Sequence, residues 1–260
     1  MGHTRLVRLP GTRKWSAVVG LLESGAPDAT VLSATATAAE RDLAAAARNP
    51  VFVEAVRLLC QIPMAARSDN FAASLRHEGL DAGAAPGLLD IVMAASQKLD
   101  EARAGMRSAD DFAELSARAL VSTISDTFGS ALPGLLDPDP EHLRIEVRKF
   151  ATPEGFQRLS RTFFDKLLDA TLRYWLDRAL PKQTGEGRRF RTMGDRGAFD
   201  AAMSQYVSEA TRIIKEFSRG WYAKVAVSGQ SVPSDRAAAF GHVAFKKIGE
   251  ELRRKCDADD

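Results

Sequence analysis

The feature that most constrains the fold is the helical periodicity of residues 152–180, TPEGFQRLSRTFFDKLLDATLRYWLDRAL. Apolar side chains recur there at spacings of three and four residues, which places them on one face of an α-helix: Phe156, Leu159, Phe163, Leu167, Leu168, Leu172 and Trp175. Arginines and aspartates take the opposite side. Because full burial of a Phe side chain contributes about 1.5–3 kcal/mol, this stretch predicts a core helix on which the others pack.

The ends of this helix carry the expected terminal signals. Thr152 is suited to cap the first free amides, and Pro153 fits the first helical position. Pro181 is expected to stop the helix, because proline lacks the amide hydrogen that the helix needs. We expect one apolar core shared by several helices: Phe163, Leu167, Trp175, Met203, Ile213, Phe217 and Phe245.

Similar periodicity, bounded by glycine, proline and capping residues, predicts helices along the rest of the chain. They cover residues 12–23, 28–49, 50–62, 69–77, 88–106, 110–128, 142–150, 195–221 (or 197–221) and 236–255. We expect Pro63 to kink or end its helix, Ser108 to begin a capping box, and 223–227 to be the one candidate strand. The sequence therefore predicts an all-α fold, a bundle of about eight to ten helices in two subdomains sharing an interface, with at most one short β element.

Residues 132–140, LPGLLDPDP, are the best candidate for a domain boundary, with three prolines and a glycine. The charge balance changes at the same place. Residues 1–140 carry 13 Lys+Arg against 17 Asp+Glu, whereas residues 141–256 carry 23 against 14. We therefore predict an N-terminal helical subdomain over 1–136 and a basic C-terminal one over 137–260, the latter suited to an acidic partner such as nucleic acid.

The sequence motifs of the common enzyme classes are missing. The chain has no GxxxxGK[ST] loop, no GxGxxG after a strand, and no GxSxG, HExxH or CxxC motif. Its four histidines are far apart, so we predict neither a metal centre nor a cofactor. Asp137, Asp139 and Glu141 alternate in a way that suits a divalent cation, but a proline turn in which Asp139 caps the next helix is the simpler interpretation.

Cysteine content and hydropathy indicate the compartment. Cys60 and Cys256 form neither a disulfide framework nor a metal pair, which fits a reducing environment. No segment approaches the roughly 18 apolar residues of a membrane span, and the first residues lack the apolar run of a signal peptide. We therefore expect a cytoplasmic protein that makes no contact with a membrane.

The loop after residue 181, KQTGEGRRFRTMGDRG, gathers positive charge around one aromatic ring. Glu186 and Asp195 are the only acids in it. Such a loop is suited to bind phosphates and to stack on a base, although a solvated connector is the simpler interpretation. We expect its cations to stay solvated or to meet an acidic partner, and their replacement to leave stability nearly unchanged. The candidate residues are Lys182, Arg188, Arg189, Phe190, Arg191 and Arg196.

Arg236 and His242 stand six residues apart in the segment RAAAFGH. This spacing resembles the Rx4–6H motif of the HEPN family, whose all-helical members include metal-independent ribonucleases. The resemblance covers these two residues and the helical class. It implies that Arg236 and His242, paired across a dimer, promote attack by the RNA 2′-hydroxyl. Ala237 stands where the family usually has a polar residue.

The sequence favours a non-catalytic cytoplasmic accessory or adaptor protein that acts through a protein partner and through the backbone of nucleic acid. Its abundance of Ala and Arg is typical of GC-rich bacterial genomes, so we expect a bacterial multi-component system, such as one for phage defence or a mobile element. The alternative is a HEPN-like ribonuclease using Arg236 and His242. The enzyme needs His242 to face a solvent cleft, whereas the adaptor does not.

Overall fold

The structure, a computed structural model, describes residues 11–106, 110–130, 132, 139–227 and 231–259. Helix accounts for 79% of the described residues, which confirms the predicted all-α multi-helix bundle. Among the described residues, the only β pairing is an isolated bridge between Thr184 and Phe190. No helix in this part of the chain is both long enough and apolar enough to cross a membrane.

The N-terminal helices begin where capping side chains stand. They are α1 (Arg13–Glu23), α2 (Asp28–Ala46), α3 (Pro50–Ala65), α4 (Phe71–His77), α5 (Leu88–Ala104) and α6 (Asp111–Gly129). Thr12, Asn49 and Asp110 each accept hydrogen bonds from amides of the first turn. Pro63 lies inside α3, which ends two residues later. The capping box expected at Ser108 lies outside the described residues, and Asp110 is the cap of α6.

The C-terminal half contains longer helices. They are α7 (Pro140–Arg148), α8 (Pro153–Leu176), the 3₁₀ turn η1 (Leu180–Gln183), α9 (Met193–Ala210), the 3₁₀ turn η2 (Thr211–Ile213), α10 (Ile214–Val227) and α11 (Ser234–Asp259). The helix predicted from residue 195 or 197 to 221 is thus two helices. They join at η2, where the buried Thr211 donates its hydroxyl to Asp165 on α8. The candidate strand at 223–227 is wrong, because those residues complete α10.

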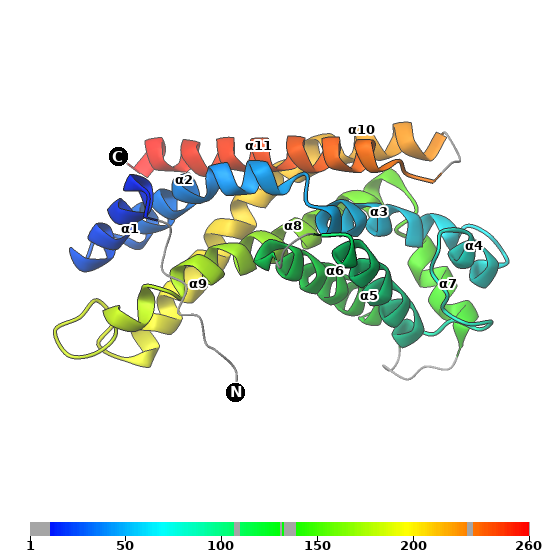
Figure 1. The fold of residues 1–260 in the computed structure, drawn as a ribbon, viewed down its shortest axis with the longest axis horizontal. Helices are drawn as coiled ribbons and strands as arrows, with labels where there is room; N and C mark the ends of the chain where they lie inside the picture. Colours follow the sequence, from blue (N-terminus) through cyan, green and yellow to red (C-terminus); the bar gives the residue numbers. More distant parts are fainter. Residues whose placement is uncertain (1–10, 107–109, 131, 133–138, 228–230, 260) are drawn as a thin grey trace.

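Helix α8 runs through the middle of the molecule, as its sequence predicted (Figure 1). It contacts α6 and α10 most extensively, and also α2, α3 and α9. Thr152 caps it by accepting the amide of Gly155 at 3.0 Å. The expected stop at Pro181 is wrong, because α8 ends at Leu176, where the amide of Asp177 donates to the carbonyl of Arg173, and Pro181 belongs to η1.

The centre of the core is a group of stacked and edge-on phenylalanines. Phe52 of α3 lies 6.2 Å from Phe163, 6.1 Å from Phe164 and 5.1 Å from Phe245, measured between ring centres. The predicted core residues Phe163, Leu167, Met203 and Phe245 are buried. The other three, Trp175, Ile213 and Phe217, are partly buried and pack against this core.

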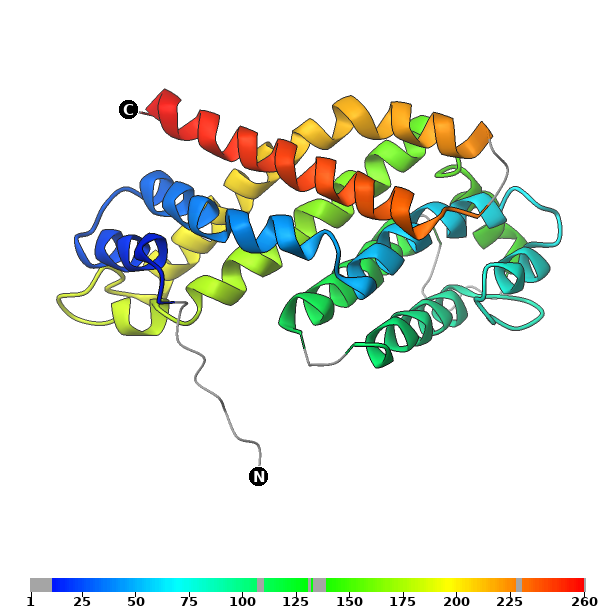
Figure 2. The same ribbon diagram turned by 45° about the horizontal axis from the view of Figure 1, so that its top comes forward.

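Helices from both halves of the sequence share this core. α11 lies along α2 and crosses α3, so the C-terminal end of the chain packs on its N-terminal half (Figures 1 and 2). Gly241 permits the crossing, because a Cβ there would collide with the ring of Phe52. The division at 136/137 stays a prediction, since residues 133–138 lie outside the described part of the chain.

Candidate nucleic-acid interface

The basic loop predicted from the sequence is closed on itself at its base. The amide of Gly185 donates to the carbonyl of Phe190 at 2.8 Å, and the amide of Phe190 donates to the carbonyl of Gln183 at 2.9 Å. Gly185 and Gly187 take φ angles of 129° and 71°, a left-handed backbone that glycine adopts without strain. The loop is therefore a compact turn that projects from the body beside α9 (Figure 1).

Two of the six candidate residues hold this loop to the core. Phe190 is buried, with its ring 5.4 Å from that of Phe199. Only 8% of the Arg189 side chain is exposed, and its guanidinium pairs with Asp28 of α2 at 2.5 Å. The expectation that Arg189 stays solvated is therefore wrong, while the expected small effect of its replacement on stability stays a prediction. Phe190, being buried, does not offer its ring to an incoming base.

The other four candidates divide into one paired and three exposed cations. Arg196 forms ion pairs with Asp177 at 2.7 Å and Asp200 at 3.1 Å. The remaining three are exposed, and none has an ion pair within the described residues: Lys182, Arg188 and Arg191. The structure therefore leaves half of the predicted site free to meet a partner.

The N-terminus of α9, which adjoins the loop, is already satisfied. Thr192 accepts the amide of Asp195 at 3.1 Å, and Asp195 accepts the amide of Thr192 at 2.9 Å. The hydrogen bonds that the Asp195 carboxylate accepts from the backbone and the side chain of Thr192 lower its pKa, and the charge of Arg191 adds to the effect. Because a carboxylate already occupies this helix end, it is a poor site for a phosphate.

A second group of cations lies on α8, on the side that the sequence assigned only to polar residues. Five residues of α8 between positions 158 and 166 take part, and they are spaced by three, one, three and one along the helix, which keeps them on one face. With one side chain of α10 they line a cavity of about 450 Å³, named here the basic cavity: Arg158, Arg161, Thr162, Asp165, Lys166 and Lys215.

Two cations of the basic cavity are held by neighbouring helices. Arg161 donates to the carbonyl and the hydroxyl of Ser208 at 3.1 and 3.3 Å. Lys166 donates to Ser122 at 2.8 Å and to Asp126 at 2.6 Å. Arg161 thus bonds directly to neutral acceptors and has the carboxylate of Asp165 near it, whereas Lys166 is partly neutralised by Asp126.

The other two cations are free of acids in the described part of the chain. The guanidinium of Arg158 lies 5.3 Å from the centre of the Phe150 ring, a cation–π contact that orients it without removing its charge. Arg158 and Lys215 are exposed, and neither has an ion pair among the described residues. They are therefore the cations best placed to meet an anion.

Asp165 is the one carboxylate in the basic cavity, and it is half-buried. Burial raises its pKa, while the hydroxyl of Thr211 at 2.9 Å and the charge of Arg161 oppose the rise. Burial thus penalises the one negative charge in the lining of the basic cavity, while Asp126 competes from outside the lining for Lys166.

Replacing Asp165 by Asn is expected to raise the stability of the protein at neutral pH. A carboxyl whose pKa is raised on folding contributes stability below its unfolded pKa of about 3.9, and this contribution is lost as pH rises through the folded pKa. The gain from Asp165→Asn should therefore be present at pH 7 and vanish below about pH 3.9. Urea unfolding of the parent and the Asp165→Asn protein, at pH 7 and below about pH 3.9, measures this gain in the free energy of unfolding. A gain of equal size at both pH values would contradict a raised pKa for Asp165.

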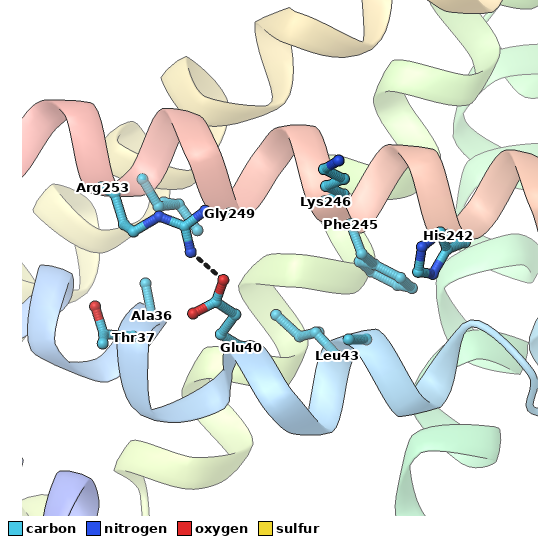
Figure 3. Close-up of a pocket in the computed structure, with 11 residues that line it drawn as sticks. Ala36, Thr37, Glu40, Leu43, His242, Phe245, Lys246, Gly249 and Arg253 are labelled. Atoms are coloured by element: carbon cyan, nitrogen blue, oxygen red, sulfur yellow. Dashed lines mark hydrogen bonds and ion pairs between the residues drawn. The ribbon is translucent and has the colours of Figure 1, made fainter.

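The ribonuclease residues occupy different places on α11. His242 is exposed and lines a shallow groove of about 140 Å³ between α2 and α11 (Figure 3). Glu40 and Arg253 pair across this groove, and Lys246 lies beside His242 on the same helix. Arg236 is exposed and is not part of the lining.

A helical separation of six residues turns Arg236 and His242 about 120° away from each other and about 9 Å apart along the axis. A single chain therefore does not bring the two side chains together. His242 does face a solvent groove, which is the feature that the ribonuclease requires.

Among the described residues, no three His, Cys, Asp or Glu side chains are placed to hold a metal ion. Asp139 caps α7 by accepting the amide of Glu141 at 3.0 Å, as the simpler interpretation predicted, while Asp137 lies outside the described residues. Comparison of the chain with protein families, curated proteins and solved structures gives no significant match.

Proposed function

We propose that this protein is a non-catalytic binding protein that engages the phosphate backbone of nucleic acid through the basic cavity. The observation that supports this function is the gathering of four cations around one concave surface that contains a single carboxylate. Two of these cations, Arg158 and Lys215, have no acid partner in the described part of the chain. Lys and Arg side chains that neutralise phosphates release counterions, and this release drives binding with little dependence on sequence.

The binding should weaken with salt in proportion to the number of phosphate contacts. Each contact contributes about 0.7 to the slope of log K against log salt for single strands and about 0.9 for duplexes. Replacing Arg158 and Lys215 by Gln removes two contacts, so we expect the slope to fall by about 1.4 to 1.8. Fluorescence anisotropy with labelled DNA and RNA oligomers over a salt series measures the slope for the parent and the variant.

The exposed loop supplies a control of equal charge. Changing Arg188 and Arg191 to Gln removes the same two positive charges from another surface. A slope that falls only in the Arg158→Gln, Lys215→Gln protein supports the basic cavity as the interface. A slope that falls only in the loop variant would assign the contact to the loop. A parent that does not bind in low salt would contradict the proposal.

A metal-independent ribonuclease is the second candidate, because His242 is exposed in a groove. We expect no cleavage of single-stranded RNA by the purified protein in the presence of a chelator, since Arg236 and His242 do not meet within one chain. Gel analysis of a labelled oligomer tests this expectation. Cleavage that His242→Ala abolishes, with the circular dichroism unchanged, would support the ribonuclease instead.

Binding without catalysis fits an accessory or adaptor subunit that also contacts a protein. Two large apolar side chains one turn apart on the outer side of α5 support such a contact: Leu89 is 48% and Met93 70% exposed.

Cys60, a free and buried thiol, is compatible with the cytoplasm of a bacterium. A multi-component system, such as one for phage defence or a mobile element, is the setting we propose.

A further inference from the structure

The one carboxylate in the lining of the basic cavity receives few hydrogen bonds. Oδ1 of Asp165 accepts from the hydroxyl of Thr211 at 2.9 Å, and the carbonyl of Ser208, at 3.1 Å, shares the single proton of that hydroxyl. Oδ2 has no donor within the described part of the chain, yet it is not sealed off, because Asp165 lines the cavity. An ionised carboxylate has about four acceptor sites, so Asp165 has room for a donor that comes from the cavity.

The free cations and this carboxylate lie at different ends of the basic cavity. Helix α10 runs antiparallel to α8, because η2, the turn before it, bonds Asp165, whereas Arg219 further along pairs with Glu154 at 2.6 Å. Lys215 lies between these two contacts, so it stands opposite the part of α8 that carries Arg158. Arg158 precedes Asp165 by two helical turns, about 10 Å, on the same side of α8. A ligand that fills the cavity therefore meets cations first and a carboxylate about two turns further along.

The carboxylate indicates which ligand fits this arrangement. The negative charge of Asp165 opposes the binding of a phosphate by Arg161 and Lys166, its neighbours on α8. It favours binding only by accepting a hydrogen bond from the ligand, and bonds to an ionised acceptor are about twice as strong as neutral ones. The sugar of RNA has such a donor, the 2′-hydroxyl, on the carbon next to the one that bears the 3′ phosphate. The sugar of DNA has none there.

Building on the proposed function, we propose that the basic cavity selects RNA over DNA and that Asp165 recognises the ribose. Arg158 and Lys215 hold a phosphate at one end of the cavity, and the adjoining ribose donates its 2′-hydroxyl to Oδ2 of Asp165. The cavity thus reads the sugar and the phosphate and leaves the bases unread, so its selectivity does not depend on base sequence.

The test compares three single-stranded oligomers of one length and one sequence of adenine and cytosine: DNA, RNA and 2′-O-methyl RNA. Fluorescence anisotropy with the full chain at low salt gives a Kd for each. RNA should bind about tenfold tighter than DNA, because the added hydrogen bond has a charged acceptor. The 2′-O-methyl RNA should bind as weakly as DNA, since it keeps the ribose but lacks the donor.

The outcomes distinguish this selectivity from the binding on which it rests. Equal affinity for RNA and DNA, or 2′-O-methyl RNA that binds as tightly as RNA, would overturn the selectivity and leave the proposed function standing. Failure of all three oligomers to bind would overturn both.

Two variants separate the hydrogen bond from the charge. Asp165→Asn keeps an oxygen for Thr211 but turns an amide NH2 toward the cavity, so it removes the acceptor together with the negative charge. DNA should bind this variant more tightly, and the ratio of RNA to DNA affinity should fall to about one. The matched control is Asp126→Asn, which removes an equal charge beside Lys166 but outside the lining. It should tighten the binding of RNA and DNA alike and keep the ratio. A ratio that survives in Asp165→Asn, or that falls equally in Asp126→Asn, would overturn the role of Asp165.

Discussion

Replacing Gly155 by Ala is expected to destabilise the protein by about 3 kcal/mol or more, because the added Cβ has no room. Gly155 lies in the first turn of α8, where the chain doubles back from α7. A Cβ there would collide with the carbonyl oxygen of Lys149 and lie 2.5 Å from the Cα of Phe150. Both neighbours are backbone atoms, so no side-chain rotation relieves the contact, and the turn that follows α7 must move away from α8.

The matched control for this substitution is Gly220→Ala. Gly220 lies inside α10, where an added Cβ meets nothing within 4 Å. Alanine is the better helix former by about 0.5–1 kcal/mol, so this variant should be slightly more stable than the parent. Urea unfolding followed by circular dichroism measures both. A Gly155→Ala protein as stable as the Gly220→Ala protein would mean that the turn at Lys149 and Phe150 does not approach α8 as closely as described.

Replacing Phe163 by Ala should cost about 3–5 kcal/mol, through lost burial and the cavity that remains. Phe163 is fully buried, and its ring lies 5.3 Å from Phe164 and 6.2 Å from Phe52. Since these rings belong to both α3 and α8, collapse around the cavity requires two helices to shift. Phe217, which is only partly buried, provides a comparison: Phe217→Ala should cost clearly less. A loss below about 1 kcal/mol for Phe163→Ala would contradict the central position of α8.

The sequence predicted the helices because their evidence is local. The apolar spacing of α8 and the cap at Thr152 depend on residues a few positions apart, and both are confirmed. Two errors concern where helices end. Pro181 did not set the end of α8, and η2 interrupts a helix whose apolar pattern continues, at the point where Thr211 bonds Asp165.

The sequence alone did not show which cations of the basic loop form ion pairs. Counting the acids within the loop ignored Asp28 of α2 and Asp177 at the end of α8, which the fold brings to Arg189 and Arg196, and also Asp200, one turn after Arg196 on α9. The basic cavity was missed for the opposite reason. The spacing of Arg158, Arg161 and Lys166 shows that they share a face of α8, but only the fold places Lys215 beside them.

The most direct test of the proposed interface is lysine acetylation with and without a saturating DNA oligomer, quantified by mass spectrometry. Lys215 lines the basic cavity, whereas Lys182 lies on the loop and Lys224 is exposed on α10 away from the lining, so one experiment contains its own controls. We predict that the oligomer slows the modification of Lys215 several-fold and leaves Lys182 and Lys224 unchanged. Protection of Lys182 with none of Lys215, or equal rates at all three lysines, would contradict the assignment of nucleic-acid binding to the basic cavity.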